Sequence, residues 1–258
     1  MIPIRDSITS IHTPYVNYLM IAICSIVFLA QVGSGDNGQR IIEGFGMVPL
    51  RLTDPEAEAV MPIVRQVATP AGLMLEEQLR VLAPSAVNPW LTVLTCMFLH
   101  GGWMHFLGNM WFLYIFGDNV EDRFGHFGYL LLYLGTGIAA ALSHWVTAMN
   151  SPIPTVGASG AIAGVMGAYA LLYPHARVLS VLPIFVFLQT FVLPAPIFLG
   201  IWFAIQIFSG FASGAGSTGV AWWAHIGGFV AGAGLAMLVN LTSLGRTEAT
   251  MVNRRQRF

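Results

Sequence analysis

Residues 157–168 read GASGAIAGVMGA, an uncharged run in which a small residue recurs every four positions. One row consists of Ser159, Ala163 and Gly167, and the row beside it of Gly160, Gly164 and Ala168. Residues four apart share a helix face, and rows of small residues let membrane helices approach closely. The stretch therefore predicts a membrane helix whose backbone lies against that of a neighbour.

The composition of the whole chain also indicates a membrane protein. Of its 258 residues, 56% are hydrophobic and 9% are charged, whereas soluble domains carry about 25% charged residues. The formal net charge is -1 and every basic residue is arginine, so we expect no nucleic-acid partner and no basic targeting patch. Cys24 and Cys96 lie in apolar runs and match no metal or redox spacing.

Six apolar runs are long enough to cross a bilayer, which takes about 20 mostly apolar residues. They cover residues 15–33, 90–116, 127–149, 158–173, 195–212 and 221–243. The predicted fold class is an all-α polytopic membrane protein, a bundle of six transmembrane helices. Residues 178–212 are too long for one span and too short for two, and Pro183, Pro194 and Pro196 interrupt them. We expect their first part to be a loop or an interfacial segment, with a seventh span as the alternative.

The distribution of arginine predicts the orientation, since cytoplasmic segments carry an excess of basic residues. Six spans place seven arginines on one side (Arg5, Arg123, Arg177, Arg246, Arg254, Arg255 and Arg257) and four on the other (Arg40, Arg51, Arg65 and Arg80). Both termini are therefore predicted to be cytoplasmic. The predicted organisation is a tail over residues 1–14, a membrane domain over 15–243 and a tail over 244–258. The membrane domain includes an extracytoplasmic loop over residues 34–89, whose apolar patches predict a folded, interfacial structure.

Polar side chains inside the predicted spans are candidates for function, because burying them in hydrocarbon is costly. They are His100, His105, Asn109, Ser143, His144, Ser159 and His225. In the predicted orientation, the second, fourth and sixth spans run from outside to inside. His105, Asn109, Ser159 and His225 then share one depth, in the outer half of the membrane.

Ser159 and His225 are the predicted nucleophile and base of covalent catalysis. His225 is followed by Gly228, Gly232 and Ala236, a second row of small residues that can face the first. This packing would bring the hydroxyl near the imidazole. A neutral imidazole can take the hydroxyl proton as the serine oxygen attacks a carbonyl carbon.

Stabilisation of an oxyanion is the other requirement of acyl transfer. His105 and Asn109 lie four residues apart on one helix face and can donate hydrogen bonds, as can the N–H of Ser159. Ser143 and His144 are adjacent, so they point about 100° apart on a helix. We expect packing roles for this pair.

At these residues the chain resembles the rhomboid family of intramembrane serine proteases. The matching motifs are His100-Gly-Gly-Trp-Met-His105-Phe-Leu-Gly-Asn109, Glu121-Asp-Arg123, Gly157-Ala-Ser159-Gly160, and Ala224-His225-Ile-Gly-Gly228 continuing to Gly232. The resemblance implies a six-helix core without metal or cofactor, a Ser–His dyad without a triad acid, and oxyanion stabilisation by His105 and Asn109. It also implies cleavage of transmembrane segments of other membrane proteins near the extracytoplasmic face.

The chain departs from the family pattern at one position. Known members often carry an aromatic residue four positions after the nucleophile, where it packs on the base, and this chain has Ala163 there. We expect another ring, or closer helix packing, to orient His225. Glu121 and Arg123 are expected to form a structural hydrogen-bond network.

Three other functions fit parts of the pattern. A small transporter also places polar residues in spans, although transporters usually show repeats and none is evident in the sequence. A catalytically silent rhomboid-like protein would bind membrane helices and tolerate loss of Ser159. A haem or metal protein would use several of the histidines, but no carboxylate is evident to orient them.

The function predicted is cleavage of single-span membrane protein substrates within the lipid bilayer, with no cofactor. The sequence indicates neither the identity of the substrate nor an oligomeric state. A short N-terminal segment without a recognisable organelle transit peptide predicts a multi-pass protein of a prokaryotic plasma membrane.

Overall fold

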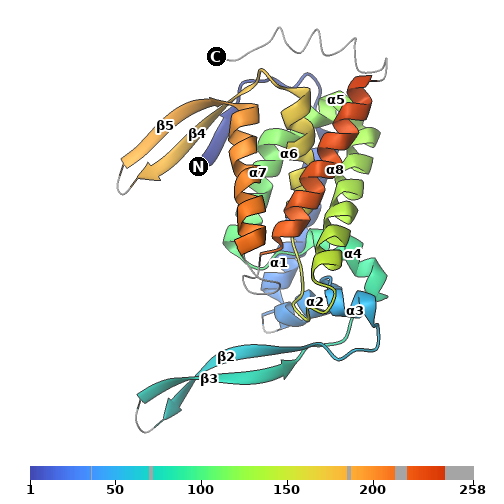
Figure 1. Cartoon of the computed structure of the whole chain (residues 1–258), viewed down its shortest axis with the longest axis vertical. Coiled ribbons are helices and arrows are strands. Elements are labelled where there is room, and N and C mark those ends of the chain that lie inside the picture. Colours follow the sequence, from blue (N-terminus) through green and yellow to red (C-terminus); the bar gives the residue numbers. More distant parts are fainter. Residues whose placement is uncertain (36, 70–71, 185–186, 213–219, 242–258) are drawn as a thin grey trace.

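Helices form most of the structure, which is a computed structural model (Figure 1). The structure describes residues 1–258 except 36, 70–71, 185–186, 213–219 and 242–258, so the tail predicted over 244–258 lies outside the described residues. The helices are α1 (Tyr15–Gly33), α2 (Asn37–Phe45), α3 (Pro49–Thr53), α4 (Thr92–Thr95), α5 (Trp103–Thr147), α6 (Ser159–Leu172), α7 (Ala195–Ala212) and α8 (Trp222–Leu241). Two 3-10 helices, η1 (Pro89–Leu91) and η2 (Cys96–Phe98), flank α4.

The chain also contains strands, so the prediction of an all-α fold is wrong in this respect. The strands are β1 (Ile2–Asp6), β2 (Val60–Thr69), β3 (Gly72–Val81), β4 (Arg177–Ile184) and β5 (Phe187–Pro194). One antiparallel sheet has the order β1-β4-β5, and β2 pairs with β3 in an antiparallel hairpin. The strands β2 and β5 are rich in β-branched or aromatic residues, which favour pleated structure. The sequence analysis expected a loop or an interfacial segment before residue 195 and a folded structure over residues 34–89, and it assigned no strand to either.

The segment over residues 178–212 contains β4, β5 and α7. Its described residues before Ala195 are in strands, so they hold no seventh spanning helix. Pro183 lies in β4 opposite Leu188, and Pro194 ends β5 directly before α7. Proline is unfavourable in the interior of a helix, and these two prolines lie outside one. Pro196 is the second residue of α7, in the first turn, where proline is tolerated.

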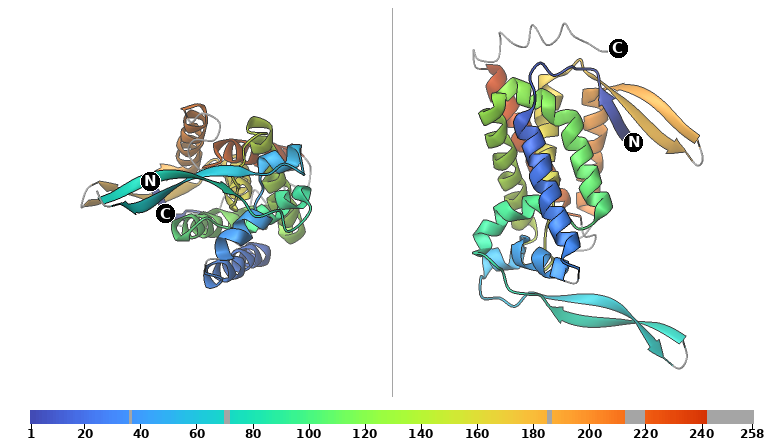
Figure 2. Two further views of the ribbon diagram at one scale, coloured as in Figure 1. Left: turned by 90° about the horizontal axis from the view of Figure 1, so that it is seen from below. Right: turned by 180° about the vertical axis from the view of Figure 1, so that it is seen from behind.

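Four helices in the described residues are long and apolar enough to cross a membrane: α1, α5, α7 and α8. The 45-residue α5 contains Gly125, whose φ of 69° and ψ of 165° are not helical. The chain reverses at this glycine, so the two halves of α5 run in opposite directions (Figure 2). The 14-residue α6 is apolar but shorter.

The predicted start of the second span, at residue 90, is wrong. Residues 89–98 form the separate short helices η1, α4 and η2, and α5 begins at Trp103. The chain between them is extended at Leu99, with φ of -90° and ψ of 153°. Gly101 and Gly102 follow, and glycine is a poor helix former. His100 therefore lies before the helix that carries His105 and Asn109.

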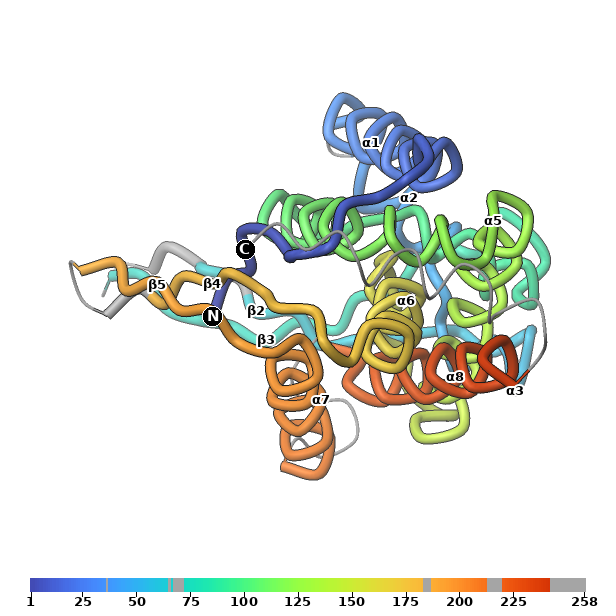
Figure 3. The backbone as a smooth tube through the Cα atoms, turned by 90° about the horizontal axis from the view of Figure 1, so that it is seen from above, coloured from blue at the N-terminus to red at the C-terminus, as the bar shows by residue number. Residues whose placement is uncertain are grey.

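Helix α6 lies at the centre of the bundle, between α8 and the two halves of α5 (Figure 3). Residues 160–169 of α6 are all buried, which accounts for its lack of charge. A Cβ added at Gly228 of α8 would collide with the carbonyl oxygen of Gly160. The rows of small residues seen in the sequence therefore place two helix backbones in direct contact.

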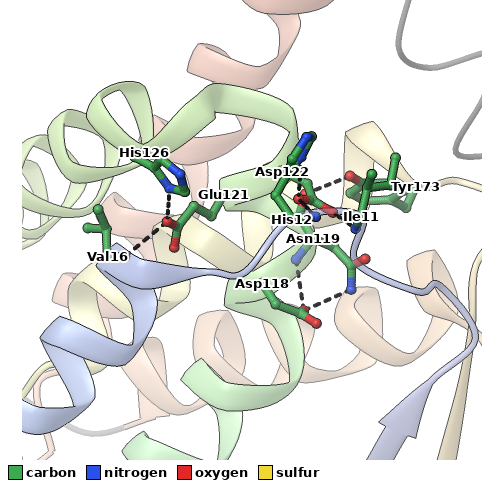
Figure 4. Close-up of polar contacts among 9 residues, drawn as sticks. All are labelled: Ile11, His12, Val16, Asp118, Asn119, Glu121, Asp122, His126 and Tyr173. Carbon is green, nitrogen blue, oxygen red and sulfur yellow. Dashed lines mark hydrogen bonds and ion pairs between the residues drawn. The ribbon is translucent and has the colours of Figure 1, made fainter.

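Acidic side chains at the Gly125 end of the bundle join α1 to α5 (Figure 4). The carboxylate of Glu121 accepts hydrogen bonds from the N–H groups of Val16 and Asn17, at 2.9 and 2.7 Å. These N–H groups lie in the first turn of α1, where they have no acceptor within the helix. The carboxylate of Asp122 accepts from the N–H of His12 at 2.9 Å. Glu121 thus has the structural role expected for it.

A hydrogen bond also joins the C-terminal end of α6 to the Gly125 end of the bundle. The hydroxyl of Tyr173 donates to the carbonyl oxygen of Asn119 at 2.6 Å (Figure 4). Ser159 lies at the opposite end of α6, more than three helical turns away.

Candidate active site

Ser159 and His225 lie in hydrogen-bond contact where α6 and α8 cross. Ser159 is the first residue of α6, and His225 lies in the first turn of α8. The Oγ atom of Ser159 is 2.8 Å from Nε2 of His225. At this distance the ring can take the proton of the hydroxyl.

Two residues of α7 complete the surroundings of His225, and the sequence analysis did not select them. Nδ1 of His225 lies 2.8 Å from Oε1 of Gln206. The Trp202 ring lies 5.8 Å from the imidazole, centroid to centroid, at an interplanar angle of 38°. Gln206 is a polar residue within a predicted span, so it met the same criterion as the histidines, namely that polar side chains are costly to bury in hydrocarbon. Trp202 carried no such signal, yet it supplies the ring expected in the absence of an aromatic residue at Ala163.

His105 lies in the first turn of α5, and its ring rests on the backbone that precedes Ser159. A Cβ added at Gly157 would lie 2.7 Å from both Cε1 and Nε2 of His105. Gly157 also has a φ of 129°, a conformation that residues with a Cβ rarely adopt. Glycine at this position therefore lets the His105 ring approach the start of α6.

Asn109 lies one turn after His105, on the same face of α5. Its side chain is 8% exposed, and its Nδ2 has no acceptor among the described residues. A buried amide donor without a partner is energetically costly. Asn109 lines the same cavity as Ser159, so its amide can donate to a group bound there.

The start of α6 supplies backbone donors as well. The N–H of Ile162 donates to the carbonyl oxygen of Ala158 at 2.9 Å, the first bond of this helix. The N–H groups before Ile162 have no acceptor in the helix, and the helix dipole makes this end partially positive. The N–H of Ser159 is one of them, so the nucleophile and a donor for an oxyanion belong to the same residue.

The side chains named so far line one cavity of about 1310 Å³. Its walls include Ser159, His225, His105, Asn109, Trp202 and Gln206. These six residues come from four helices, α5, α6, α7 and α8, and the two that the sequence analysis did not select both lie on α7. A cavity of this size has room for a short stretch of polypeptide.

The other polar candidates have different surroundings. The backbone of His100 exchanges two hydrogen bonds with the side-chain amide of Gln31, each of 3.1 Å. The hydroxyl of Ser143 donates to the carbonyl oxygen of Ala139 at 2.8 Å within its own helix, in keeping with a packing role. His144 lines the cavity on the α5 side, so it is closer to the site than the sequence analysis expected.

The described residues contain no group of three or more His, Cys, Asp or Glu side chains placed to hold a metal ion. The rings of His100 and His105 lie 5.4 Å apart, centroid to centroid. Both nitrogens of His225 are occupied by Ser159 and Gln206. The haem or metal alternative gains no support from this part of the chain.

Comparison with known proteins gives a family match that covers the candidate active site. The family model described as "Rhomboid domain" matches residues 87–241, which is more than half of the chain. This range includes every candidate residue of the site and leaves out α1 and most of the loop over residues 34–89.

Individual relatives match over shorter stretches. The chain is 41% identical over 83 residues to rhomboid-like protein 11, chloroplastic, of Arabidopsis thaliana, covering 32% of this chain and 29% of that protein. It is 41% identical over 88 residues to rhomboid protease GluP of Bacillus subtilis, covering 34% and 16%. It is 31% identical over 103 residues to rhomboid protein 1, mitochondrial, of Saccharomyces cerevisiae, covering 38% and 30%. The matched region spans less than a third of the length of each of these relatives.

Proposed function

Because this chain belongs to the rhomboid family, we propose that it is an intramembrane serine endopeptidase. Its substrates are the transmembrane segments of other membrane proteins, and single-span proteins are the simplest of these. The contact that carries the proposal is the 2.8 Å approach of Ser159 Oγ to His225 Nε2 on the wall of a cavity. A serine packed only against another helix would need neither the imidazole nor the cavity.

The reaction we propose proceeds through an acyl-enzyme. Nε2 of His225 takes the hydroxyl proton as Oγ of Ser159 attacks the peptide carbonyl carbon. The negative charge that develops on the carbonyl oxygen is stabilised by the N–H of Ser159 and the side chains of His105 and Asn109. His225 then gives its proton to the leaving amine. Water, activated by the same imidazole, hydrolyses the ester.

We propose that the chain crosses the membrane six times, through α1, the two halves of α5, α6, α7 and α8. The 14 residues of α6 give a length of about 21 Å at 1.5 Å per residue. A hydrocarbon core is about 30 Å thick, so a helix of this length leaves Ser159 recessed below one surface. Cleavage then falls within the substrate span, near that surface.

We assign the recessed surface to the extracytoplasmic side. Arg5 and Arg177 lie in the paired strands β1 and β4, and Arg123 lies beside the Gly125 turn. β1, the start of β4 and the turn between the two halves of α5 lie at the end of the bundle opposite the start of α6, which carries Ser159 (Figure 1). Basic residues favour the cytoplasmic side, so we propose that the N-terminal segment and the C-terminal end of α8 are on that side. The location we propose is the cell membrane, and a prokaryotic plasma membrane in particular.

The test is cleavage of a labelled single-span protein by the purified chain in liposomes. We expect cleavage near the outer end of the span, and a loss of at least about a thousandfold in rate for Ser159→Ala and for His225→Ala. Ser25→Ala and His175→Ala are matched controls. Ser25 bonds within α1 at 2.7 Å, and His175 is exposed beyond α6.

The outcome of this test also separates the protease from its nearest alternative. Unchanged cleavage in both site variants would assign the activity to a contaminant. Binding of the span without any cleavage would favour a catalytically silent protein that holds membrane helices.

A further inference from the structure

Gln206 contacts the nitrogen of His225 that Ser159 does not use. Its Oε1 lies 2.8 Å from Nδ1 of His225, on the far side of the ring from the 2.8 Å contact with the serine. We propose that Gln206 is the positioning residue of the base: it holds the imidazole in the Nδ1-protonated form, with the lone pair of Nε2 facing Ser159. This inference rests on the proposed function and adds a third, uncharged member to the dyad.

The orientation of the Gln206 amide follows from its other contact. Nε2 of Gln206 donates to the carbonyl oxygen of Trp202 at 3.1 Å. A carbonyl oxygen only accepts, so the amide must present its NH₂ group there. The amide oxygen is then left facing Nδ1 of His225. An amide oxygen also only accepts, so Nδ1 must carry the ring proton.

This arrangement settles what the other ring nitrogen can do. A neutral imidazole has one donor and one acceptor nitrogen. With the proton on Nδ1, Nε2 is the acceptor, and the hydroxyl of Ser159 donates to it across 2.8 Å. The opposite tautomer would direct an N–H at the serine oxygen and could not remove its proton. In a Ser–His–Asp triad the aspartate selects the same tautomer of its histidine.

Burial makes the Gln206 contact persistent. Gln206 is 4% exposed, so water competes weakly for its amide. Turning the amide away would leave buried polar groups without partners, which costs more than the bond itself contributes. A neutral amide also avoids placing a carboxylate at membrane depth, where a charge is expensive.

The simpler role for Gln206 is to join α7 to α8, since polar side chains commonly hydrogen-bond across membrane helices. That role requires only that the bond exist. The positioning role requires in addition that loss of the acceptor change the protonation pattern of His225 and slow the reaction of Ser159. These consequences can be measured separately from the stability of the fold.

The contact also links the base to the position of α7. Helix α7 lies at the edge of the bundle (Figure 3), and its residues Ile197, Ile201 and Ile205 are exposed. Movement of α7 away from α8 would break the bond from Gln206 to His225. The reactivity of Ser159 would then depend on whether α7 is packed against α8.

The experiment compares the full chain with Gln206→Met, which keeps the length of the side chain and removes the acceptor, and with Gln206→Glu, which restores an acceptor. The first readout is the ¹⁵N NMR spectrum of histidine-labelled protein in detergent, with His225→Ala to assign the His225 signals. The second is the rate at which a fluorophosphonate labels Ser159. Gln189→Met is the matched control, because Gln189 is exposed on β5.

We expect His225 to be protonated on Nδ1 in the unchanged chain, and Gln206→Met to shift it toward the Nε2-protonated form. The labelling rate should fall about tenfold, as for loss of one hydrogen bond. Gln206→Glu should keep the Nδ1-protonated form, and Gln189→Met should change neither readout.

An unchanged tautomer in Gln206→Met would overturn the inference, as would an unchanged labelling rate in a chain that does label. Failure of the unchanged chain to label or cleave would instead contradict the proposed function. The NMR readout would still decide whether Gln206 selects the tautomer.

Discussion

The backbone of Gly232 in α8 lies against the carbonyl oxygen of Gly164 in α6, so closely that a Cβ on Gly232 would collide with it. The same relationship recurs one turn earlier, between Gly228 and Gly160. These contacts set the crossing of the two helices. They therefore also set the separation of Ser159, which is adjacent to Gly160, and His225, which lies about one turn before Gly228.

Gly232→Ala should force α8 away from α6 and damage both the fold and the site. Overpacking of this kind typically costs about 1–3 kcal/mol. We expect a lower temperature of thermal unfolding in detergent and a slower reaction of Ser159 with a fluorophosphonate.

Gly234→Ala is the matched control for this substitution. A Cβ at Gly234 meets no atom within 4 Å, and alanine favours a helix over glycine by about 1 kcal/mol. This variant should unfold at the same or a higher temperature and label at the normal rate. Equal behaviour of the two alanine variants would show that the Gly164–Gly232 contact does not limit helix packing.

Asn109→Ala should lower kcat about a hundredfold, with KM changed much less, because an oxyanion donor acts in the transition state. The steady-state rates of cleavage, measured over a range of substrate concentrations in liposomes, separate the two constants. Leu107→Ala is a control on the same helix, since Leu107 is exposed. A rise in KM alone would assign Asn109 to substrate binding.

Glu121→Ala should destabilise the fold by about 3 kcal/mol, because it leaves one buried and one partly buried backbone N–H group at the start of α1 without acceptors. Glu121 is 1% exposed and lies at the end of the bundle away from Ser159. We expect a lower unfolding temperature. At temperatures where the variant is folded, the labelling rate of Ser159 should be normal.

The control for Glu121 is Glu77→Ala, because Glu77 is exposed on β3. It should leave both the unfolding temperature and the labelling rate unchanged. A Glu121 variant that folds normally but fails to label would give this carboxylate a part in the chemistry.

The membrane helices were predictable where an uninterrupted apolar run had the length of one span. The run over 195–212 has the bounds of α7, and the run over 15–33 those of α1. The second span was harder, because the residues from Leu99 to Gly102 carry no formal charge and the apolar run continues on both sides of them. The break there depends on backbone conformation, which composition does not record.

The hairpins and the α7 side of the site could not be predicted in the same way. Strands β2 and β5 need partner strands to satisfy their backbone groups, and pairing partners are not visible in hydropathy. Gln206 lies 19 residues from His225 in the chain, and its contact depends on where α7 docks. By contrast, Ser159 and His225 could be paired from the sequence, because each lies at the start of a row of small residues that specifies the helix crossing.

The central claim is that His225 activates Ser159 as a nucleophile, and one measurement tests it most directly. The purified chain is treated with a fluorophosphonate, and the modified residue is identified by mass spectrometry of the digested protein, alongside His225→Ala. We predict a single adduct on Ser159 in the unchanged chain, forming at least about a hundredfold more slowly in the variant. An adduct on another serine, or equal labelling of Ser159 without His225, would contradict the account.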